Sequence, residues 1–328
     1  MCVIAAPAGD LPKCGAVVTR RAGRKRALTA VVGTLAAAAV LVWVLTDRRG
    51  AFLAALGAAP MWILLVATLL QLLALVSRTE AWHVCVTAAG GRLGRRRLYH
   101  AASIGSVGSQ LNSQLGTAAR IGVLRRGAPE LCPRVPAMIA AEVPILAVEG
   151  VLAAAASFTL VVPLGLPWWV PLACLAVAAG IVAALRRMAG RWRHGFWSGL
   201  SVLRSIGGRK RVVALVLVAV FAQIGRNWLM LHAVGVDASV FDATAVLIAI
   251  VLLSQLPVGP SVGAAAVILF LGANGVALAA ASGVLLTATG TAGALAYALW
   301  AITDHLWTLR PAARVPLARE ASSVAATP

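Results

Sequence analysis

Three charged side chains interrupt stretches of sequence that are otherwise apolar. Glu142 and Glu149 are seven residues apart, so at about 100° per residue they lie within about 20° of each other on one helix face. Arg226, near Gln223 and Asn227, lies in the middle of a second stretch. A charge at the centre of a membrane span costs about 2.5 to 3.5 kcal/mol, so it is paired or functional. We expect Arg226 to pair with Glu149 or Glu142. Such a pair either locks two helices together or lines a cavity for a charged headgroup.

Two polar segments broken by glycine or proline also interrupt the apolar sequence, one in each half of the chain. The first lies around Asn112 and Gln114, and the second begins with Ser254 and Gln255. Broken helices expose backbone donors and acceptors at membrane depth, and a corresponding pair of them is typical of transporter binding sites. Free N–H groups at the start of a half-helix would attract phosphate. The alternative is that the prolines of the second segment only kink a packed helix.

Catalytic and metal-binding patterns are absent from the sequence. Its five histidines show no H-x-x-x-H or H-E-x-x-H spacing, and its five cysteines form no C-x-x-C pair. No P-loop, serine nucleophile elbow or kinase motif occurs. We therefore expect no enzymatic activity, no metal and no cofactor.

The elements that hold these polar side chains must be membrane helices. Of the 328 residues, 61% are hydrophobic and 12% are charged, whereas soluble domains carry about 45 to 50% apolar and about 25% charged residues. Apolar runs long enough to cross about 30 Å of hydrocarbon lie at 27–46, 60–77, 135–162, 168–185, 212–234 and, in broken form, 243–309. We expect an all-α, polytopic integral membrane helical bundle of about eight spans, with one or two re-entrant or broken polar segments. Pro144 predicts a kink in the third run.

The 29 basic residues outnumber the 10 acidic residues and give a net charge of +19. The segment 98–119 is too polar to face lipid along a full helix, so we expect it to dip into the membrane and return on the same side. With that return, 26 of the 29 bases fall on one side, all except Arg48, Arg49 and Arg226. The positive-inside rule identifies that side as the cytoplasm. We therefore expect a plasma-membrane protein with both termini in the cytoplasm, whose partners are anionic phospholipids and not nucleic acid.

Three regions follow from this topology: a basic cytoplasmic tail at 1–26, a single transmembrane domain at 27–309, and a short cytoplasmic tail at 310–328. Within the domain, 186–211 is a basic cytoplasmic loop. Its apolar side chains recur at helical spacing: Trp192, Phe196, Leu200 and Leu203. They predict an interfacial helix on an anionic leaflet. The alternative is a solvated connector whose aromatic side chains pack against the bundle.

Several short segments follow one another in a recognisable order. They are RTEAW at 78–82, AG at 89–90, GTAAR at 116–120, the arginines 125–126, Glu142, and the segment 256–263 that begins with Leu-Pro. This order resembles the transmembrane region of lysylphosphatidylglycerol synthases, a flippase-like family of bacterial membrane proteins, over residues 72–309. Thr117 stands where that family has an acid, and residues 264–266 lack its late glutamate.

The resemblance implies that the chain moves an aminoacylated or otherwise modified phospholipid between leaflets. Arg120 and Arg226 would receive its phosphate, and Glu142 and Glu149 would receive a cationic headgroup or pair with those arginines. The expected substrate-binding set is Arg120, Glu142, Glu149, Arg226, Gln223, Asn227, Asn112, Gln114, Ser254 and Gln255. The family's soluble synthetase domain is not part of this sequence, so lipid synthesis is not expected. Two other interpretations are a non-transporting scaffold that binds membrane-protein partners among envelope enzymes, and a membrane-embedded enzyme acting on a lipid-linked substrate.

Overall fold

A computed structural model of the chain describes residues 49–111, 113–161, 165, 167–192, 195–253 and 276–309. Across these residues every regular element is a helix, which confirms the expected all-α fold. The α-helices are α2 (Arg49–Ala58), α3 (Met61–Ala88), α4 (Arg95–Leu111), α5 (Ser113–Gly127), α6 (Val135–Ala140), α7 (Val143–Ala156), α9 (Trp169–Arg191), α10 (Ile206–Ala233), α11 (Val240–Leu253) and α13 (Val276–Leu309). The 3₁₀ helices are η2 (Pro129–Leu131), η3 (Ser157–Leu160) and η4 (Gly195–Arg204). The predicted span 27–46 and the tails 1–26 and 310–328 lie outside the described residues.

Five helical segments are long and apolar enough to cross a membrane. They are Met61–Ala88, Val135–Leu160, Trp169–Arg191, Ile206–Ala233 and Ala280–Asp304. Segments of 23 to 28 residues extend about 35 to 42 Å, which exceeds the about 30 Å of hydrocarbon in a bilayer. Helices thereby confirm the predicted runs at 60–77, 168–185 and 212–234, and the run at 135–162 as far as Leu160, so the chain is a polytopic membrane protein.

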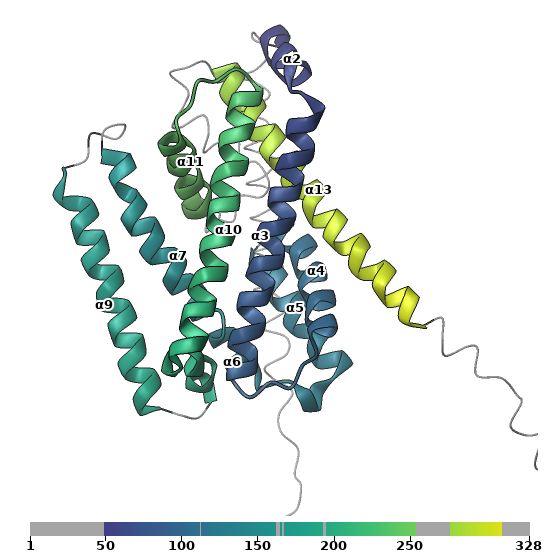
Figure 1. Cartoon of the computed structure of the whole chain (residues 1–328), viewed down its shortest axis with the longest axis vertical. Helices are drawn as coiled ribbons and strands as arrows, with labels where there is room; N and C mark the ends of the chain where they lie inside the picture. The colour runs from purple at the N-terminus through teal and green to yellow at the C-terminus, as the bar shows by residue number, and fades with distance from the viewer. Residues whose placement is uncertain are drawn as a thin grey trace, which may run out of the picture.

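The outer faces of these helices are apolar, as lipid contact requires. Leu69 on α3, Val177 on α9 and Phe221 on α10 are all exposed. Helix α9 lies at the edge of the bundle, next to α7 (Figure 1), and only Pro171 and Ala189 of α9 are buried. Most of the α9 surface is therefore available to lipid.

Helices α3 and α10 form the central antiparallel pair of the bundle (Figure 1). Small residues build part of their contact, where Ala74 on α3 packs with Ala219 and Ala222 on α10. Small side chains let helix backbones approach closely, and such packing drives association in lipid, where no hydrophobic force acts between helices. Helix α13 also packs on α3, and a Cβ atom on Gly293 of α13 would lie 2.6 Å from the Gln71 Cγ atom. The centre of the bundle therefore depends on close approach of α3, α10 and α13.

The polar segment 98–119 falls in a helical hairpin, in which α4 and α5 pack against each other (Figure 1). Their backbones touch, because a Cβ atom on Gly116 would lie 2.6 Å from the Gly105 carbonyl oxygen. The chain leaves the hairpin at the end where it entered, since the Arg92 N–H donates to the Leu131 carbonyl at 3.0 Å. The segment thus turns back on itself, which is the geometry that a re-entrant segment requires.

The apolar run 135–162 is broken where Pro144 predicts a kink. Helix α6 ends at Ala140 and, after a two-residue turn, α7 begins at Val143. Pro144 has no N–H to donate to the Ala140 carbonyl, so the regular hydrogen-bond ladder stops there. The Glu142 N–H instead closes a tight turn onto the Ile139 carbonyl at 3.1 Å. The predicted kink is confirmed, and it leaves Glu142 at the start of α7.

Basic side chains gather at one end of the bundle, the lower end in Figure 1, where α3 and α9 end and α4 and α10 begin. Glu80, near the end of α3, joins these elements: its carboxylate lies 3.4 Å from the Arg95 guanidinium of α4 and 3.7 Å from that of Arg211 of α10. Acidic Asp237 and Asp242 belong to the opposite end, where α10 ends and α11 begins. Asp237 and Asp242 thus lie far from the end at which most of the described bases gather.

The apolar stripe predicted in the loop 186–211 does not share one helix face. The stripe enters η4, which is a 3₁₀ helix with about 3.0 residues per turn in place of 3.6. Leu200 is fully buried, whereas Phe196 is 39% and Trp192 is 60% exposed. The stripe is therefore not one face of a regular α-helix, while the position of this loop on an anionic leaflet stays a prediction. Leu200 packs against the bundle while Phe196 and Trp192 stay exposed, and the solvated connector likewise stays a prediction.

Candidate functional site

One face of α3 carries the side chains around which the candidate site is built. Gln71, Arg78 and Trp82 follow one another at intervals of seven and four residues, which is the spacing of a single helix face. Helices α5, α7 and α10 supply the side chains that meet them. Helix α3 is thus the element that positions the site.

The first ion pair joins α3 to α7. The Arg78 Nη1 atom lies 3.0 Å from the Glu149 Oε1 atom, and Nη2 donates to Oε2 at 3.2 Å. Two parallel contacts of this kind form the stronger, bidentate type of ion pair. The Arg78 side chain is 47% exposed and that of Glu149 is 23% exposed, so another charged group could reach this pair. Arg78 was not among the predicted site residues, although its position near the end of an apolar run was an available signal.

The second ion pair joins α5 to the break before α7. Arg120 pairs with Glu142, and the Arg120 Cζ atom lies 3.8 Å from the centroid of the Trp82 indole. A guanidinium over an indole face gains a cation–π interaction. The Arg120 side chain is only 14% exposed, and its Nε atom has no hydrogen-bond partner among the described residues. The buried Trp82 ring therefore holds Arg120 in place while one of its donors stays unused.

The two ion pairs are neighbours in the bundle. Trp82, which contacts Arg120, comes one turn after Arg78 on α3, and Glu149 comes about two turns after Glu142. Together the two pairs contain two guanidinium and two carboxylate groups, so their charges balance. Such a site matches a ligand that carries one phosphate and one ammonium group, because arginine binds phosphate and carboxylate binds ammonium.

Arg226 does not pair with Glu149 or Glu142, so that prediction is wrong. Its Nη1 atom donates to the Gln71 Oε1 atom. Arg226 thus lies at the level of Gln71, which is seven residues, or about 10.5 Å, along α3 from Arg78. Since Arg78 holds Glu149, the register between α3 and α10 keeps Arg226 away from that carboxylate. This register between α3 and α10 could not be predicted from the sequence.

Arg226 belongs to a second polar layer of the bundle. Asn227, the next residue, is fully buried, and neither atom of its amide has a hydrogen-bond partner in the described part of the chain. Gly290 of α13 leaves room for Arg226, because a Cβ atom there would lie 3.4 Å from Nη1. Gln223 is half-buried one turn earlier on α10. None of the polar side chains named in this layer is a carboxylate.

Two tyrosines near the ion pairs were also missed by sequence reasoning. The Tyr297 hydroxyl donates to the Thr79 hydroxyl at 3.2 Å, and the Tyr99 hydroxyl donates to the Glu80 carboxylate at 2.8 Å. Burial, and then the hydrogen bond to Glu80, raises the pKa of Tyr99, so it remains a donor. Their rings lie 6.2 Å apart. They are the only tyrosines of the chain, and that scarcity was the available signal.

The predicted substrate-binding set divides into three groups. Arg120, Glu142 and Glu149 take part in the two ion pairs, and Arg226, Asn227 and Gln223 form the separate layer. Asn112, Ser254 and Gln255 lie outside the described residues, and so does the Gln114 side chain, although Gln114 belongs to α5.

Within the described ranges, no cluster of three or more histidine, cysteine, aspartate or glutamate side chains is placed to hold a metal ion. No protein-family model matches the chain, and a search of curated proteins finds no matching sequence. The functional assignment therefore depends on the chemistry of the site.

Proposed function

We propose that this protein binds a phospholipid with a zwitterionic or aminoacylated headgroup inside the bundle and translocates it across the plasma membrane. The observation that carries the proposal is the pair of neighbouring ion pairs, Arg78 with Glu149 and Arg120 with Glu142, within a bundle of membrane helices. A phospholipid with a phosphate and a free amine presents the same two charges. The protein would then be a flippase-like membrane protein, similar to the transmembrane region of lysylphosphatidylglycerol synthases.

The charged side chains of the two ion pairs would bind the headgroup by exchanging each other for its phosphate and ammonium groups. Its phosphate would replace a carboxylate at Arg78 or Arg120, and its ammonium would replace a guanidinium at Glu142 or Glu149. Removing one partner of a largely buried pair such as Arg120 with Glu142 leaves an uncompensated charge, and exchange avoids this cost because every charge keeps a partner. Arg78 is the more exposed guanidinium, so it would make the first contact, while Trp82 keeps Arg120 in position.

We assign the basic end of the bundle to the cytoplasm, with both termini on that side, about eight spans in all, and the α4–α5 hairpin as a re-entrant segment. Two observations support this topology. Basic side chains gather where α3 and α9 end, and the hairpin returns to the end at which it began. An anionic inner leaflet would attract that end of the molecule.

A purely structural role of the ion pairs is the main competing explanation. The pair Arg78 with Glu149 joins α3 to α7, so in a non-transporting scaffold it could act as a lock between helices. The two roles differ in what happens when the charges are removed but the hydrogen bonds are kept.

The test is lipid redistribution in proteoliposomes that contain labelled lysylphosphatidylglycerol, phosphatidylglycerol or phosphatidylethanolamine. The variant R78Q/E149Q removes both charges and leaves two amides that can hydrogen-bond between α3 and α7, and D237N removes one exposed charge at the opposite end. We expect R78Q/E149Q to retain its thermal stability but to slow translocation at least about tenfold, since each hydrogen bond to a charged group contributes about 1.5 to 3 kcal/mol. D237N should behave as the parent.

Three results would count against the proposal. Full transport by R78Q/E149Q would show that the charges do not bind the lipid. Loss of transport only in proportion to lost folding would identify a helix lock. No protein-dependent redistribution of any of these lipids would exclude translocation.

A further inference from the structure

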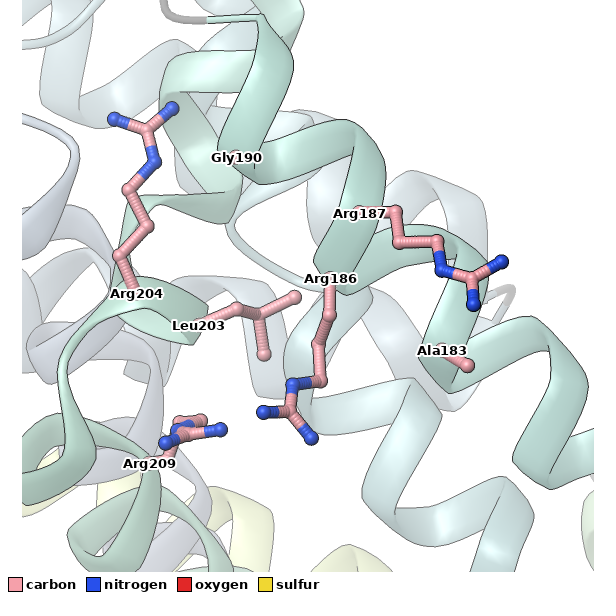
Figure 2. A pocket seen from close by; sticks show the side chains of 7 residues that line it. All are labelled: Ala183, Arg186, Arg187, Gly190, Leu203, Arg204 and Arg209. Atoms are coloured by element: carbon pink, nitrogen blue, oxygen red, sulfur yellow. The ribbon is translucent and has the colours of Figure 1, made fainter.

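A basic pocket lies on elements other than those that hold the two ion pairs. It occupies about 440 Å³ between the end of α9, the end of η4 and the start of α10 (Figure 2), within the range of about 300 to 1,000 Å³ that is typical of ligand sites. None of the described residues that line it is acidic, and four are arginines: Arg186, Arg187, Arg204 and Arg209. A pocket of this composition is suited to an anion.

The arginines of the pocket form no ion pair with any acidic side chain in the described part of the chain. The side chains of Arg186 and Arg209 point toward one another across the pocket, whereas Arg187 points away from them (Figure 2). Two facing guanidinium groups repel each other, and an anion between them converts this repulsion into attraction. Arg186 and Arg209 are therefore the expected ligands of that anion.

Arg204 is held in the pocket wall by the end of α9. Its Nε atom donates to the Ala189 carbonyl at 2.7 Å, and its Nη2 atom donates to the Trp192 carbonyl at 2.9 Å. The last carbonyls of a helix have no partner within it, so a guanidinium there caps the helix and complements its dipole. Arg204 thereby fastens η4 to α9 and keeps the pocket formed before any ligand arrives.

The α9 face that borders the pocket continues as an apolar strip toward the opposite end of the bundle. Its members lie at steps of three or four residues, share one helix face and are all exposed: Leu172, Ala176, Ala179 and Ala183. Leu203 adds an apolar side chain to the pocket itself. A free phosphate would leave this strip uncovered, whereas the acyl chains of a lipid would cover it.

We propose that the pocket binds the headgroup of an anionic phospholipid, whose acyl chains lie along the α9 strip. Arg186 and Arg209 hold the phosphate oxygens, for which the planar guanidinium fork is well suited, and Arg204 adds a fixed charge. The bound lipid removes the repulsion between α9 and α10 and so stabilises their junction. The site does not depend on the proposed translocation, since it requires only that the bundle lies in a membrane.

The test is lipid binding by the full chain in detergent, followed by native mass spectrometry during titration with phosphatidylglycerol, phosphatidylcholine or glycerol 3-phosphate. The variant R186Q/R209Q removes the two facing charges but leaves the Arg204 cap intact. The matched control R125Q/R126Q removes two exposed charges of α5 at the same end of the bundle. We expect R186Q/R209Q to weaken phosphatidylglycerol binding at least about tenfold and the control to weaken it less than about threefold.

Phosphatidylcholine and glycerol 3-phosphate should bind the parent protein much more weakly than phosphatidylglycerol. Equal losses in the two double variants would indicate a diffuse basic surface and overturn the pocket assignment. Equal binding of glycerol 3-phosphate would indicate a soluble-anion site in place of a lipid site. Should R186Q/R209Q fail to fold, R186K/R209K replaces it. This variant keeps both charges but lacks the two planar guanidinium groups, so we expect it to bind phosphatidylglycerol more weakly than the parent does. Parent-like binding by that variant would overturn the assignment.

Discussion

Replacing Gln71 and Arg226, singly and together, should reveal strong coupling between the two side chains. Arg226 is 7% exposed and donates to the Gln71 amide oxygen, while its Nε atom has no partner within the described residues. Gln71→Leu removes this acceptor and leaves the buried guanidinium without it. A hydrogen bond to a charged group contributes about 1.5 to 3 kcal/mol, so we expect the free energy of unfolding to fall by that amount.

Arg226→Met removes the charge together with its desolvation cost and leaves only the neutral Gln71 oxygen unpaired. We therefore expect Arg226→Met to lower the free energy of unfolding by about 1 to 2 kcal/mol, less than Gln71→Leu does. The double variant Q71L/R226M replaces a buried polar pair by apolar side chains of similar size, which is often close to neutral. The two single losses should consequently not add, and the coupling free energy should reach at least about 2 kcal/mol.

A control cycle on Glu149 and Arg226 tests the register of the helices. Their levels along α3 differ by about 10.5 Å, and substitutions that far apart are additive within about 0.5 kcal/mol. E149Q/R226M should therefore show no coupling. The assay is equilibrium unfolding in mixed micelles, followed by tryptophan fluorescence. Coupling of Arg226 to Glu149 as large as its coupling to Gln71 would refute the register that separates the two polar layers.

Other contacts lead to further expected outcomes. Gly116→Leu should lower the free energy of unfolding by about 1 to 3 kcal/mol through overpacking, because its Cβ atom would lie 2.6 Å from a carbonyl oxygen of α4. Gly122→Leu has open space around it and should be tolerated in the same unfolding assay. Single cysteines placed at Arg134 and Asp237 in a cysteine-free background should react with impermeant maleimide from opposite sides of the membrane, and labelling from one side would contradict the topology. Burial raises the pKa of the Cys132 thiol, so its thiolate forms at higher pH than in the unfolded chain. Maleimide labelling of Cys132 should then be slower at pH 7 than in denatured protein, and equal rates would contradict its burial.

The helices and the uneven distribution of charge could be predicted because they depend on local sequence. An apolar run of spanning length forms a helix in lipid, since no other local structure satisfies its backbone hydrogen bonds. Pro144 stops the hydrogen-bond ladder wherever the segment lies in the bundle. The polar segment 98–119 likewise predicts a returning hairpin, because a full lipid-facing helix of that composition would be costly.

The candidate site was predictable only as a set of side chains that need partners. Glu142, Glu149 and Arg226 are conspicuous because each is a charge within an apolar run. Arg78 and Gln71, which bind two of them, carry weaker signals. One lies near the end of its run, and the other is a single neutral amide.

Composition and periodicity alone determine that this chain is a helical membrane protein and that certain interior charges require compensation, and they predict that most bases lie on one side. Only the tertiary structure decides that Arg226 binds Gln71 while Glu149 binds Arg78. The reason is that partner choice depends on the axial register of α3 against α10 and α7. That register is set by close packing between residues far apart in the sequence, such as Ala74 with Ala219.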